Sequence, residues 1–443
     1  MCPKIYRWRV DPQFFARLYL QRSGHHGLSL KNPMPSRNCN TPAIYPVSGI
    51  KMKAMILGAG KGTRMRPLSF DTPKPLIPFL GTPVMDSIIN HLKSQGVDQV
   101  IINTAYLGDE IERYFQSGHR YGVEITYSYE GYKDQNGFHD VAIGSAGGIA
   151  NIHQKSGFFD GTFIVLCGDA LVDVDLRAAL KFHREKKALA TVILKQVKET
   201  EVYKYGIVDL SDTGKIVQFQ EKPQQQHAIS NLANVGIYLF EPEILNYIPK
   251  DMPFDIGGDL LPLLAKNGEA LYGFQTDFNW IDIGNLGDYL KATQDALQFG
   301  SNLVTLPGTQ LKQGLHCGIN TVIQCPLSNI QGNVVIGSSC IIEKGVALKG
   351  PLLIGSNCRI ESGVKLSSSI IDDYTHIKSP ARIHNKIIYQ DYCIDNLGRY
   401  WSLSEAKLDW LISDNRSQAV EHELATLIAA QNHFENNIVH VNF

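Results

Sequence analysis

The stretch GAGKGTRMRPLSFDTPKP, residues 58–75, directly follows the short apolar run of residues 54–57. It contains three glycines, two arginines and two lysines within eighteen residues. Glycines let backbone N–H groups approach a phosphate closely, and Arg64 and Lys74 add positive charge. Pro73 and Pro75 restrict the chain on both sides of Lys74. The stretch therefore predicts a phosphate-binding loop at the end of a strand.

Two common phosphate-binding patterns do not fit this loop. The pattern GxxxxGK[ST] needs Ser or Thr after its Gly-Lys pair, but Lys61 is followed by Gly62. The dinucleotide pattern GxGxxG also fails, because Gly62 arrives one residue early. The loop therefore belongs to another class of nucleotide site.

From residue 52 to about 300, short apolar runs alternate with amphipathic helical patterns such as MDSIINHLKSQG and LRAALKFHREKK. This alternation predicts an α/β domain with a Rossmann-like mixed, largely parallel sheet and helices on both faces. In such sheets the ligand lies beyond the carboxyl ends of the strands, where the glycine loop is placed. The predicted strands are 53–57, 99–104, 124–129, 162–167, 190–197, 216–220 and 235–240.

Between residues 301 and 400 the pattern changes to a period of six. Apolar residues at this spacing predict a solenoid in which three hexads make one triangular coil and the repeated side chains stack inside. The frame slips by one residue before Ile371 and then continues at Ile377 and Ile383. The repeat predicts a parallel β-helix domain. Its repeated positions are Ile330, Ile336, Ile342, Leu348, Ile354, Ile360 and Leu366, each followed four residues later by another small or apolar residue.

The two ends of the chain differ from these domains. Residues 1–50 carry seven Lys and Arg against a single acid, Asp11. A transit peptide, a basic arm for an anionic partner and a dispensable extension before Met52 all fit residues 1–51, and we favour the extension. Residues 401–443 are predicted to be a helical tail. Its apolar stripe is expected to cap the open end of the solenoid and contains Leu408, Leu411 and Ile412.

Composition excludes several classes of function. The 443 residues allow two or three domains, and 42 basic residues balance 43 acidic ones, so no net field attracts nucleic acid or a membrane surface. The eight cysteines form no CxxC pair, which argues against a zinc site or a disulfide framework. No apolar run approaches the roughly 20 residues that span a bilayer. We expect a cytoplasmic protein that acts on small molecules.

Several motifs together resemble the sugar-1-phosphate nucleotidyltransferases. The loop sequence from Gly60 to Leu68, followed by PKPL at residues 73–76, is similar to the signature of that family. The remaining motifs occur in the order of the family, which also contains left-handed hexapeptide-repeat solenoids. These motifs are CGDALVDVDL at 167–176, FQEKP at 219–223, NVGIYLF at 234–240 and WIDIG at 280–284.

The resemblance implies nucleotidyl transfer from a nucleoside triphosphate to a sugar-1-phosphate, with release of pyrophosphate. Two anions meet in this reaction, so a metal ion and cationic side chains are the expected catalysts. The resemblance implies Mg²⁺ at Asp169 and Asp282, and catalytic roles for Arg64 and Lys74. It also implies a homo-oligomer that forms through the solenoid. Expected nucleotide-binding residues are Leu57, Gly58, Gly60, Gly62, Thr63 and Gly147, and expected sugar-phosphate-binding residues are Glu221, Lys222 and Asn234.

The substrates stay open at this point. The segment GSAGG, residues 144–148, resembles that of guanylyltransferases and favours GTP with mannose-1-phosphate. The polar insert at 131–143 departs from that group, and UTP with glucose-1-phosphate remains the alternative. Two further alternatives are a non-catalytic subunit that binds nucleotide-sugar and an acyltransferase in the solenoid that uses His316 or His376.

Overall fold

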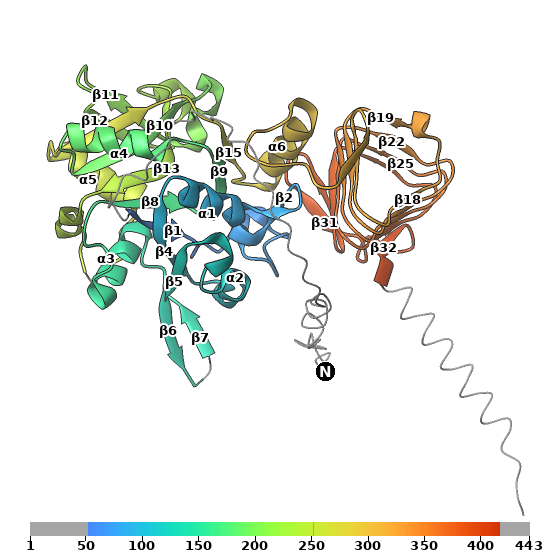
Figure 1. Cartoon of the computed structure of the whole chain (residues 1–443), viewed down its shortest axis with the longest axis horizontal. Helices are drawn as coiled ribbons and strands as arrows, with labels where there is room; N and C mark the ends of the chain where they lie inside the picture. Colours follow the sequence, from blue (N-terminus) through green and yellow to red (C-terminus); the bar gives the residue numbers. More distant parts are fainter. Residues whose placement is uncertain (1–51, 136, 251, 417–443) are drawn as a thin grey trace, which may run out of the picture. The chain divides into compact units, whose positions relative to one another are not determined.

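A computed structural model describes residues 52–135, 137–250 and 252–416. The predicted extension of residues 1–51 and the tail beyond residue 416 lie outside the described residues. In the described part, the chain forms an α/β domain followed by a solenoid of short strands (Figure 1).

The α/β domain is built on a nine-stranded mixed sheet with the order β12-β11-β13-β8-β1-β4-β5, and β10 and β14 extend it beside β13. Strands β8, β1, β4 and β5 are mutually parallel, whereas β13 is antiparallel to β8. The mixed, largely parallel sheet that the sequence predicts is confirmed. The strands are β1 Met52–Leu57, β4 Val97–Thr104, β5 Glu124–Tyr129, β8 Phe163–Cys167, β10 Ala190–Gln196, β11 Gly206–Leu210, β12 Ile216–Glu221, β13 Leu232–Phe240 and β14 Leu271–Gln275.

Helices cover both faces of this sheet, as predicted. Side chains alternate along a strand, so Ala54 and Ile56 of β1 join one buried cluster while Met55 between them joins another. The first cluster includes apolar side chains of α1, α2, α4 and α6, and the second includes those of α3 and α5. The helices are α1 Val84–Ser94, α2 Gly108–Phe115, α3 Ser145–Ser156, α4 Leu176–Glu185, α5 Leu261–Lys266 and α6 Leu286–Phe299.

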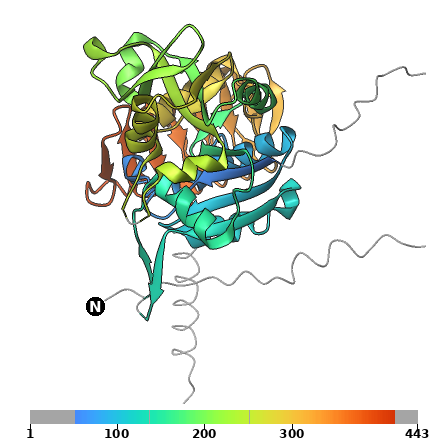
Figure 2. The same cartoon turned by 90° about the vertical axis from the view of Figure 1, so that its left-hand side faces the viewer.

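Three small antiparallel pairs complete the domain. Strands β9 (Ala170–Val172) and β15 (Trp280–Asp282) pair with each other, as do β2 (Pro78–Phe79) and β3 (Thr82–Pro83). The polar insert forms a hairpin of β6 (Gly131–Asp134) and β7 (Gly137–Asp140), which projects from the domain in both Figure 1 and Figure 2. The β9–β15 pair joins two of the predicted motifs.

The solenoid is a parallel β-helix with three stacked sheets. The repeated apolar residues face its interior, and Ile342, Ile354 and Ile360 are fully buried. The left-handedness of the solenoid stays a prediction. One sheet runs β16 Thr309–Lys312, β17 Leu315–Cys317, β20 Val334–Ile336, β23 Leu352–Ile354, β26 Ile370–Ile371, β29 Lys386–Tyr389, β30 Tyr392–Asp395 and β31 Tyr400–Ser402. The second sheet runs β18 Val322–Ile323, β21 Ile341–Ile342, β24 Arg359–Ile360, β27 Thr375–Ile377 and β32 Ile412–Asp414. The third sheet runs β19 Ile330–Gln331, β22 Ala347–Lys349, β25 Lys365–Ser367 and β28 Arg382–His384.

The register of the coils confirms the predicted slip. Before the slip, Ile342 pairs with Ile360 in the next coil. After the slip, Ile360 pairs with Ile377 and Leu366 with Ile383, so each coil is one residue shorter there. The apolar side chains therefore stay in the interior because the coil length adjusts to the sequence.

The helix predicted in the segment LSEAKLDWLISD, residues 403–414, is wrong. These residues form turns and then β32, which pairs antiparallel with β27 and places Ile412 opposite Ile377. β27, the last coil strand of its sheet, offers unpaired backbone groups that a strand satisfies and a helix does not. Side chains also favour turns here, because the Asp391 carboxylate accepts hydrogen bonds from the Ser404 hydroxyl and backbone N–H. The segment still closes the solenoid, since Ile412 is buried in its core.

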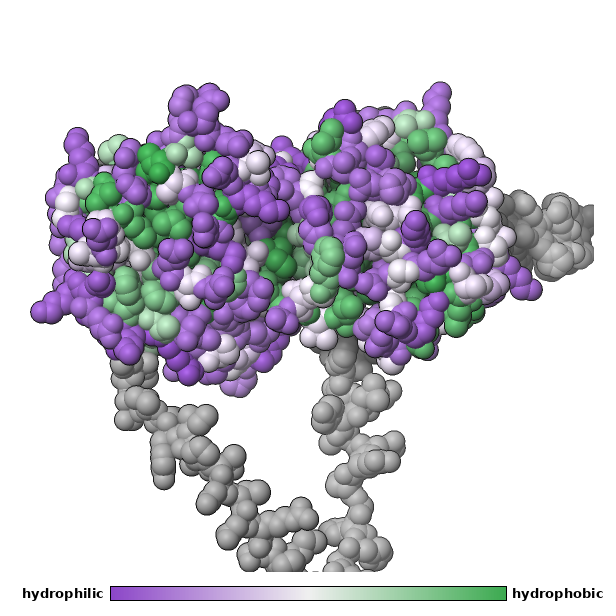
Figure 3. Space-filling model, turned by 90° about the horizontal axis from the view of Figure 1, so that it is seen from above, coloured by the Kyte–Doolittle hydropathy of each residue, from purple (hydrophilic) through white to green (hydrophobic). Residues whose placement is uncertain are grey.

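The face drawn in Figure 3 is largely hydrophilic, with smaller hydrophobic areas between the polar residues. No helix among residues 52–135, 137–250 and 252–416 is long and apolar enough to cross a membrane.

Candidate active site

The glycine loop begins where β1 ends, at the carboxyl edge of the sheet. The Gly58 N–H donates to Asn103 Oδ1 at 2.8 Å, and a Cβ on Gly58 would lie 2.9 Å from the Asn103 carbonyl oxygen. Gly62 adopts a left-handed φ of 61°, and its carbonyl accepts a hydrogen bond from Ser69 Oγ at 2.7 Å. A Cβ on Gly62 would lie 3.1 Å from the Cβ of Lys74. Backbone geometry and packing therefore require glycine at both positions.

Gly60 differs from its two neighbours in the loop, because a Cβ placed there would meet nothing within 4 Å. Packing does not require glycine at this position, and open space lies beside the backbone. The adjacent Thr63 and Arg64 are exposed, and they belong to the short 3-10 helix Thr63–Met65. This part of the loop is accessible to a ligand.

Lys74 and Asp169 are in direct contact. The Lys74 ammonium forms an ion pair with Asp169 Oδ2, and only 10% of the Lys74 side chain is exposed. Lys74 opens a short 3-10 helix after Pro73, and Asp169 follows β8 two residues beyond Cys167. Two residues that are 95 positions apart in sequence are thus brought together at the edge of the sheet.

Asp282 lies beside this ion pair. It ends β15, and its pairing partner on β9 is Ala170, the neighbour of Asp169. Burial and then the negative charge of Asp169 raise the pKa of Asp282 to about 6, while the positive charges of Lys74 and Arg64 oppose that rise. The structure therefore places two carboxylates and two cations of the predicted site within electrostatic reach of one another.

A cleft of about 420 Å³ opens next to these residues. Its walls include the loop, the carboxyl ends of the central strands, the start of α3 and the end of the insert. The predicted residues Leu57, Gly60 and Asp169 line it, and so does Lys61. A cleft at the carboxyl ends of the strands is the place where an α/β sheet binds nucleotides.

Glu130 and Asn103 also line this cleft, although no motif in the sequence marks them. Glu130 is 6% exposed and its Oε1 accepts a hydrogen bond from Asn103 Nδ2 at 2.6 Å. Burial raises the pKa of Glu130 to about 7, and the bond from Asn103 opposes the rise. Both residues lie at the carboxyl ends of predicted strands, where an α/β sheet binds its ligand, and this position alone could have marked them as site residues.

Gly147 lies elsewhere than its predicted role suggests. It belongs to α3, and its N–H donates to the Phe254 carbonyl at 3.0 Å, so this donor is already used within the protein. It lines a neighbouring apolar cavity of about 490 Å³, whereas Gly144 and Ser145 line the cleft itself. The GSAGG segment therefore reaches the cleft through its first two residues.

The predicted sugar-phosphate residues lie at the end of β12 and on β13, and β11 lies between these two strands. Glu221 ends β12, and its Oε1 accepts a hydrogen bond from Lys222 Nζ at 2.7 Å. Lys222 has a left-handed φ of 45°, and its N–H donates to the Tyr205 carbonyl at 3.1 Å. Asn234 lies on β13, where its Oδ1 accepts from the Gly236 N–H at 2.9 Å. Glu221 and Lys222 are exposed, so their charged groups are available to a ligand.

The residues present fit a divalent metal ion, although within the described ranges no group of three or more His, Cys, Asp or Glu could hold one. Mg²⁺ is commonly held by one or two carboxylates together with substrate phosphates and water, and Asp169 and Asp282 supply two. In the solenoid, His376 is buried and its Nε2 lies 2.9 Å from Glu361 Oε1. That environment does not support the acyltransferase alternative at His376.

Together, the glycine loop, the paired cations and carboxylates, and the cleft define an enzyme that handles a nucleotide and its phosphate groups. The chain belongs to the nucleotidyl transferase family, which it matches over residues 53–298. It is 44% identical over 371 residues to a UTP–glucose-1-phosphate uridylyltransferase of Synechocystis, covering 84% of this chain and 96% of that protein. It is 29% identical over 301 residues to a mannose-1-phosphate guanylyltransferase of Mycobacterium tuberculosis, covering 68% of this chain and 79% of that protein.

The chain is a sugar-1-phosphate nucleotidyltransferase. The activity, the α/β nucleotidyltransferase domain and the strand-rich domain after it agree with the sequence analysis. The non-catalytic alternative loses its basis, because these relatives carry the names of enzymes. Members of this family generally use a divalent metal ion, and a nucleoside triphosphate and a sugar-1-phosphate fit it as substrates.

Proposed function

We propose that this enzyme transfers the uridylyl group of UTP to glucose-1-phosphate, with Mg²⁺ as the metal ion. An oxygen of the sugar phosphate attacks the α-phosphorus of UTP, the bond from this phosphorus to the β-phosphate oxygen breaks, and pyrophosphate leaves. The products are UDP-glucose and pyrophosphate. The observation that carries this choice is the 44% identity to the uridylyltransferase, which extends over 96% of that protein.

The glycine loop provides the binding site for the triphosphate in this proposal. Gly60, Gly62 and Thr63 give the phosphates close access to backbone N–H groups, and Gly60 is free of packing constraints. Gly58, whose N–H donates to Asn103, instead lets the start of the loop pack against β4. Leu57, together with Gly144 and Ser145 of the GSAGG segment, frames the base and ribose. Restricted loop geometry lowers the entropy lost when the triphosphate binds.

Arg64 and Lys74 neutralise the charge that moves during transfer. Arg64 is exposed and its charge acts on Asp282. It is suited to the leaving pyrophosphate, because a guanidinium binds phosphate oxygens with two donors. Lys74 is held near the carboxylates and is suited to the α-phosphate. Asp169 and Asp282 would hold Mg²⁺, which supplies further positive charge to the phosphate groups.

Glu221, Lys222 and Asn234 bind the second substrate. The Lys222 ammonium pairs with the sugar phosphate, and Glu221 with Asn234 accepts or donates hydrogen bonds to the sugar hydroxyls. Glu221 pairs with Gly206 of β11, and Ala233, the neighbour of Asn234, pairs with Ile207 of β11. The three residues therefore lie on either side of the start of β11, which supports this assignment. Two anions then approach each other across a site that contains Lys74, Arg64 and Lys222.

A second candidate is GTP with mannose-1-phosphate, and Glu130 is the observation that favours it. An ionised carboxylate accepts hydrogen bonds from the two neighbouring donors of guanine, N1–H and the N2 amino group. Uracil instead offers one N–H donor between two carbonyl acceptors, which suits a protonated carboxylic acid. A pKa of about 7 makes both forms of Glu130 accessible near neutral pH. Glu130 is thus the residue that we assign to base selection.

A matrix of triphosphates and sugar-1-phosphates tests the substrates. Pyrophosphate release is measured with UTP, GTP, ATP and dTTP against glucose-1-phosphate and mannose-1-phosphate, with Mg²⁺ and with a chelator. We expect the highest kcat/KM for UTP with glucose-1-phosphate and no turnover with the chelator. A higher kcat/KM for GTP with mannose-1-phosphate overturns the first proposal in favour of the second. Turnover without a divalent ion contradicts the roles of Asp169 and Asp282.

We also infer a cytoplasmic homo-oligomer that forms through the solenoid. Free thiols on all six cysteines of the described ranges support a reducing compartment. Val322 and Ile341 are exposed on neighbouring strands β18 and β21, and such apolar neighbours are typical of a protein interface. Light scattering of the full chain and of an Ile341→Glu variant tests the assembly, and a monomeric parent protein contradicts it.

A further inference from the structure

The segment of residues 68–78, which joins the phosphate loop to Lys74 and continues beyond it, packs against the end of the solenoid. The Tyr389 hydroxyl donates to the Leu68 carbonyl at 3.5 Å, a long hydrogen bond, and Tyr389 and Thr72 line the same small cavity. The Phe70 and Tyr392 rings have centroids 6.0 Å apart. Two solenoid strands, β29 and β30, therefore contact the connection between Arg64 and Lys74.

This contact includes buried apolar side chains from both sides. Leu68 and Ile77 of the segment share one buried apolar cluster with Ile370 and Ile387 of the solenoid. A small cavity of about 40 Å³ lies between the two sets of residues. Because protein interiors are close-packed, a buried cluster of this kind transmits a displacement from one element to the next.

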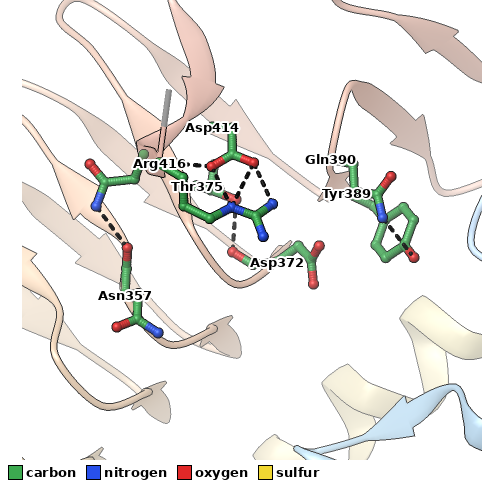
Figure 4. A network of polar contacts seen from close by, with 8 residues as sticks. Asn357, Asp372, Thr375, Tyr389, Gln390, Asp414 and Arg416 are labelled. Carbon is green, nitrogen blue, oxygen red and sulfur yellow. Dashed lines mark hydrogen bonds and ion pairs between the residues drawn. The ribbon is translucent and has the colours of Figure 1, made fainter. Parts of the chain in front are cut away.

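A neighbouring residue of the solenoid also holds the Tyr389 hydroxyl. The neighbouring Gln390 donates from Nε2 to the Tyr389 hydroxyl at 3.3 Å, a contact visible in Figure 4, where both residues lie near Asp372. A second cavity, of about 320 Å³, lies between these residues and the Thr72–Pro78 part of the segment. The phenol thus has defined partners on both sides of the contact.

The other contacts of the segment come from the α/β domain. The Tyr106 hydroxyl donates to the Phe70 carbonyl at 2.7 Å, and the Tyr289 hydroxyl donates to the Pro78 carbonyl at 2.8 Å. Phe70 is thus held from the domain through its carbonyl and from the solenoid through its ring. The conformation of the segment depends on both sides.

The segment leads directly into the site. Ser69, between Leu68 and Phe70, donates to the Gly62 carbonyl at 2.7 Å and so fixes the phosphate loop. Lys74, two residues after Thr72, packs under Gly62 and pairs with Asp169. A shift of the segment at Leu68 or Thr72 therefore moves both the loop and the Lys74 ammonium.

We propose that Tyr389 and Tyr392 of the solenoid are positioning residues for nucleotidyl transfer, because they hold the segment that places Arg64 and Lys74. The inference rests on the proposed roles of those two cations but not on the identity of the base or sugar. It assigns the solenoid a part in catalysis within one chain, in addition to any assembly role. A displacement of about 1 Å in a catalytic group can lower a rate by about 100-fold, so modest contacts suffice.

The first test measures the segment directly and needs no substrate. Hydrogen exchange by mass spectrometry follows the amides of residues 68–77 in the full chain, in Tyr392→Ala and in Tyr389→Phe. We expect faster exchange in this segment in both variants and unchanged exchange in β12 and β13. The matched control is Tyr400→Phe, since Tyr400 lies on the neighbouring strand β31 and its phenyl ring is retained. Unchanged exchange of the segment in both variants overturns the proposal.

The second test separates kcat from KM with the best substrate pair found in the matrix. For Tyr392→Ala we expect kcat to fall about tenfold or more, while the KM for the sugar phosphate stays within about twofold, because other strands bind it. For Tyr389→Phe we expect a smaller fall of about threefold, in line with the loss of one neutral hydrogen bond. A kcat equal to that of Tyr400→Phe in both variants overturns the proposal. If Tyr392→Ala does not fold, Tyr389→Phe alone decides.

A preference for GTP in the matrix contradicts the proposed substrate but leaves both tests of the tyrosines intact. Conversely, unchanged kinetics of the tyrosine variants with a working UTP assay contradict only the positioning role. The two proposals therefore fail separately.

Discussion

Glu130→Gln is the substitution that separates the two candidate bases. Glu130 is 6% exposed, and one of its carboxyl oxygens already accepts a hydrogen bond from Asn103 at 2.6 Å. Gln keeps that acceptor and puts an amide donor in the place of the second oxygen. The change thus preserves the shape of the site and alters only what it offers to the base.

The magnitude follows from the loss of one hydrogen bond to a charged acceptor. Such a bond contributes about 1.5–3 kcal/mol, which corresponds to roughly 10–150-fold in kcat/KM. We therefore expect Glu130→Gln to lower kcat/KM for GTP by about 10–150-fold at pH 8, where Glu130 is mostly ionised because its pKa is about 7. For UTP we expect a change within about threefold at pH 6, because the amide replaces the donor of the protonated acid.

The pH dependence of kcat/KM shows which protonation state of Glu130 binds the base. If protonated Glu130 binds uracil, kcat/KM of the parent enzyme for UTP falls as pH rises through about 7, and the Gln variant loses this fall. Initial rates of pyrophosphate release between pH 6 and 9 measure both effects. Glu124→Gln on β5, the strand that precedes Glu130, is the matched control, since Glu124 is exposed and lies outside the cleft. An unchanged kcat/KM for both triphosphates in Glu130→Gln refutes the assignment of Glu130 to the base.

Three further outcomes are expected. Asp282→Asn lowers kcat by about 100-fold or more at saturating Mg²⁺, whereas Asp295→Asn on the exposed face of α6 leaves it within about twofold; equal rates would remove Asp282 from the metal site. Ile354→Ala destabilises the solenoid by about 2–5 kcal/mol in urea unfolding, because this side chain is fully buried. A loss of unfolding free energy below about 1 kcal/mol argues against a packed interior there. Burial lowers the pKa of His183 despite its contact with Glu241. The folded state therefore resists protonation of this histidine and loses stability as pH falls below about 6.5. We expect the melting temperature to fall less between pH 8 and pH 5 in His183→Gln than in the parent protein.

Much of the site could be predicted because its motifs lie at fixed places along the chain. The loop follows a strand, and residues at the carboxyl ends of strands meet at one edge of the sheet. Lys74, Asp169 and Asp282 meet there, as the resemblance implied. Glu130 and Asn103 carry no motif, since a carboxylate and an amide become a pair only when β4 and β5 lie side by side. Gly147 does carry a motif, but its N–H is already bonded to the Phe254 carbonyl. A glycine motif alone does not show which N–H groups are still free to bind a ligand.

The sequence by itself determined the two architectures, because their periods differ: alternating strands and helices give a layered domain, and a six-residue repeat gives stacked coils. It also determined where the coil shortens, since the spacing of the apolar residues changes by one residue before Ile371. The tertiary structure alone decided the fate of residues 403–414, because the free edge of β27 offered backbone partners that outweighed their helical pattern. It also decided that Tyr389 and Tyr392 reach the segment before Lys74, a contact across more than 300 residues that no local pattern encodes.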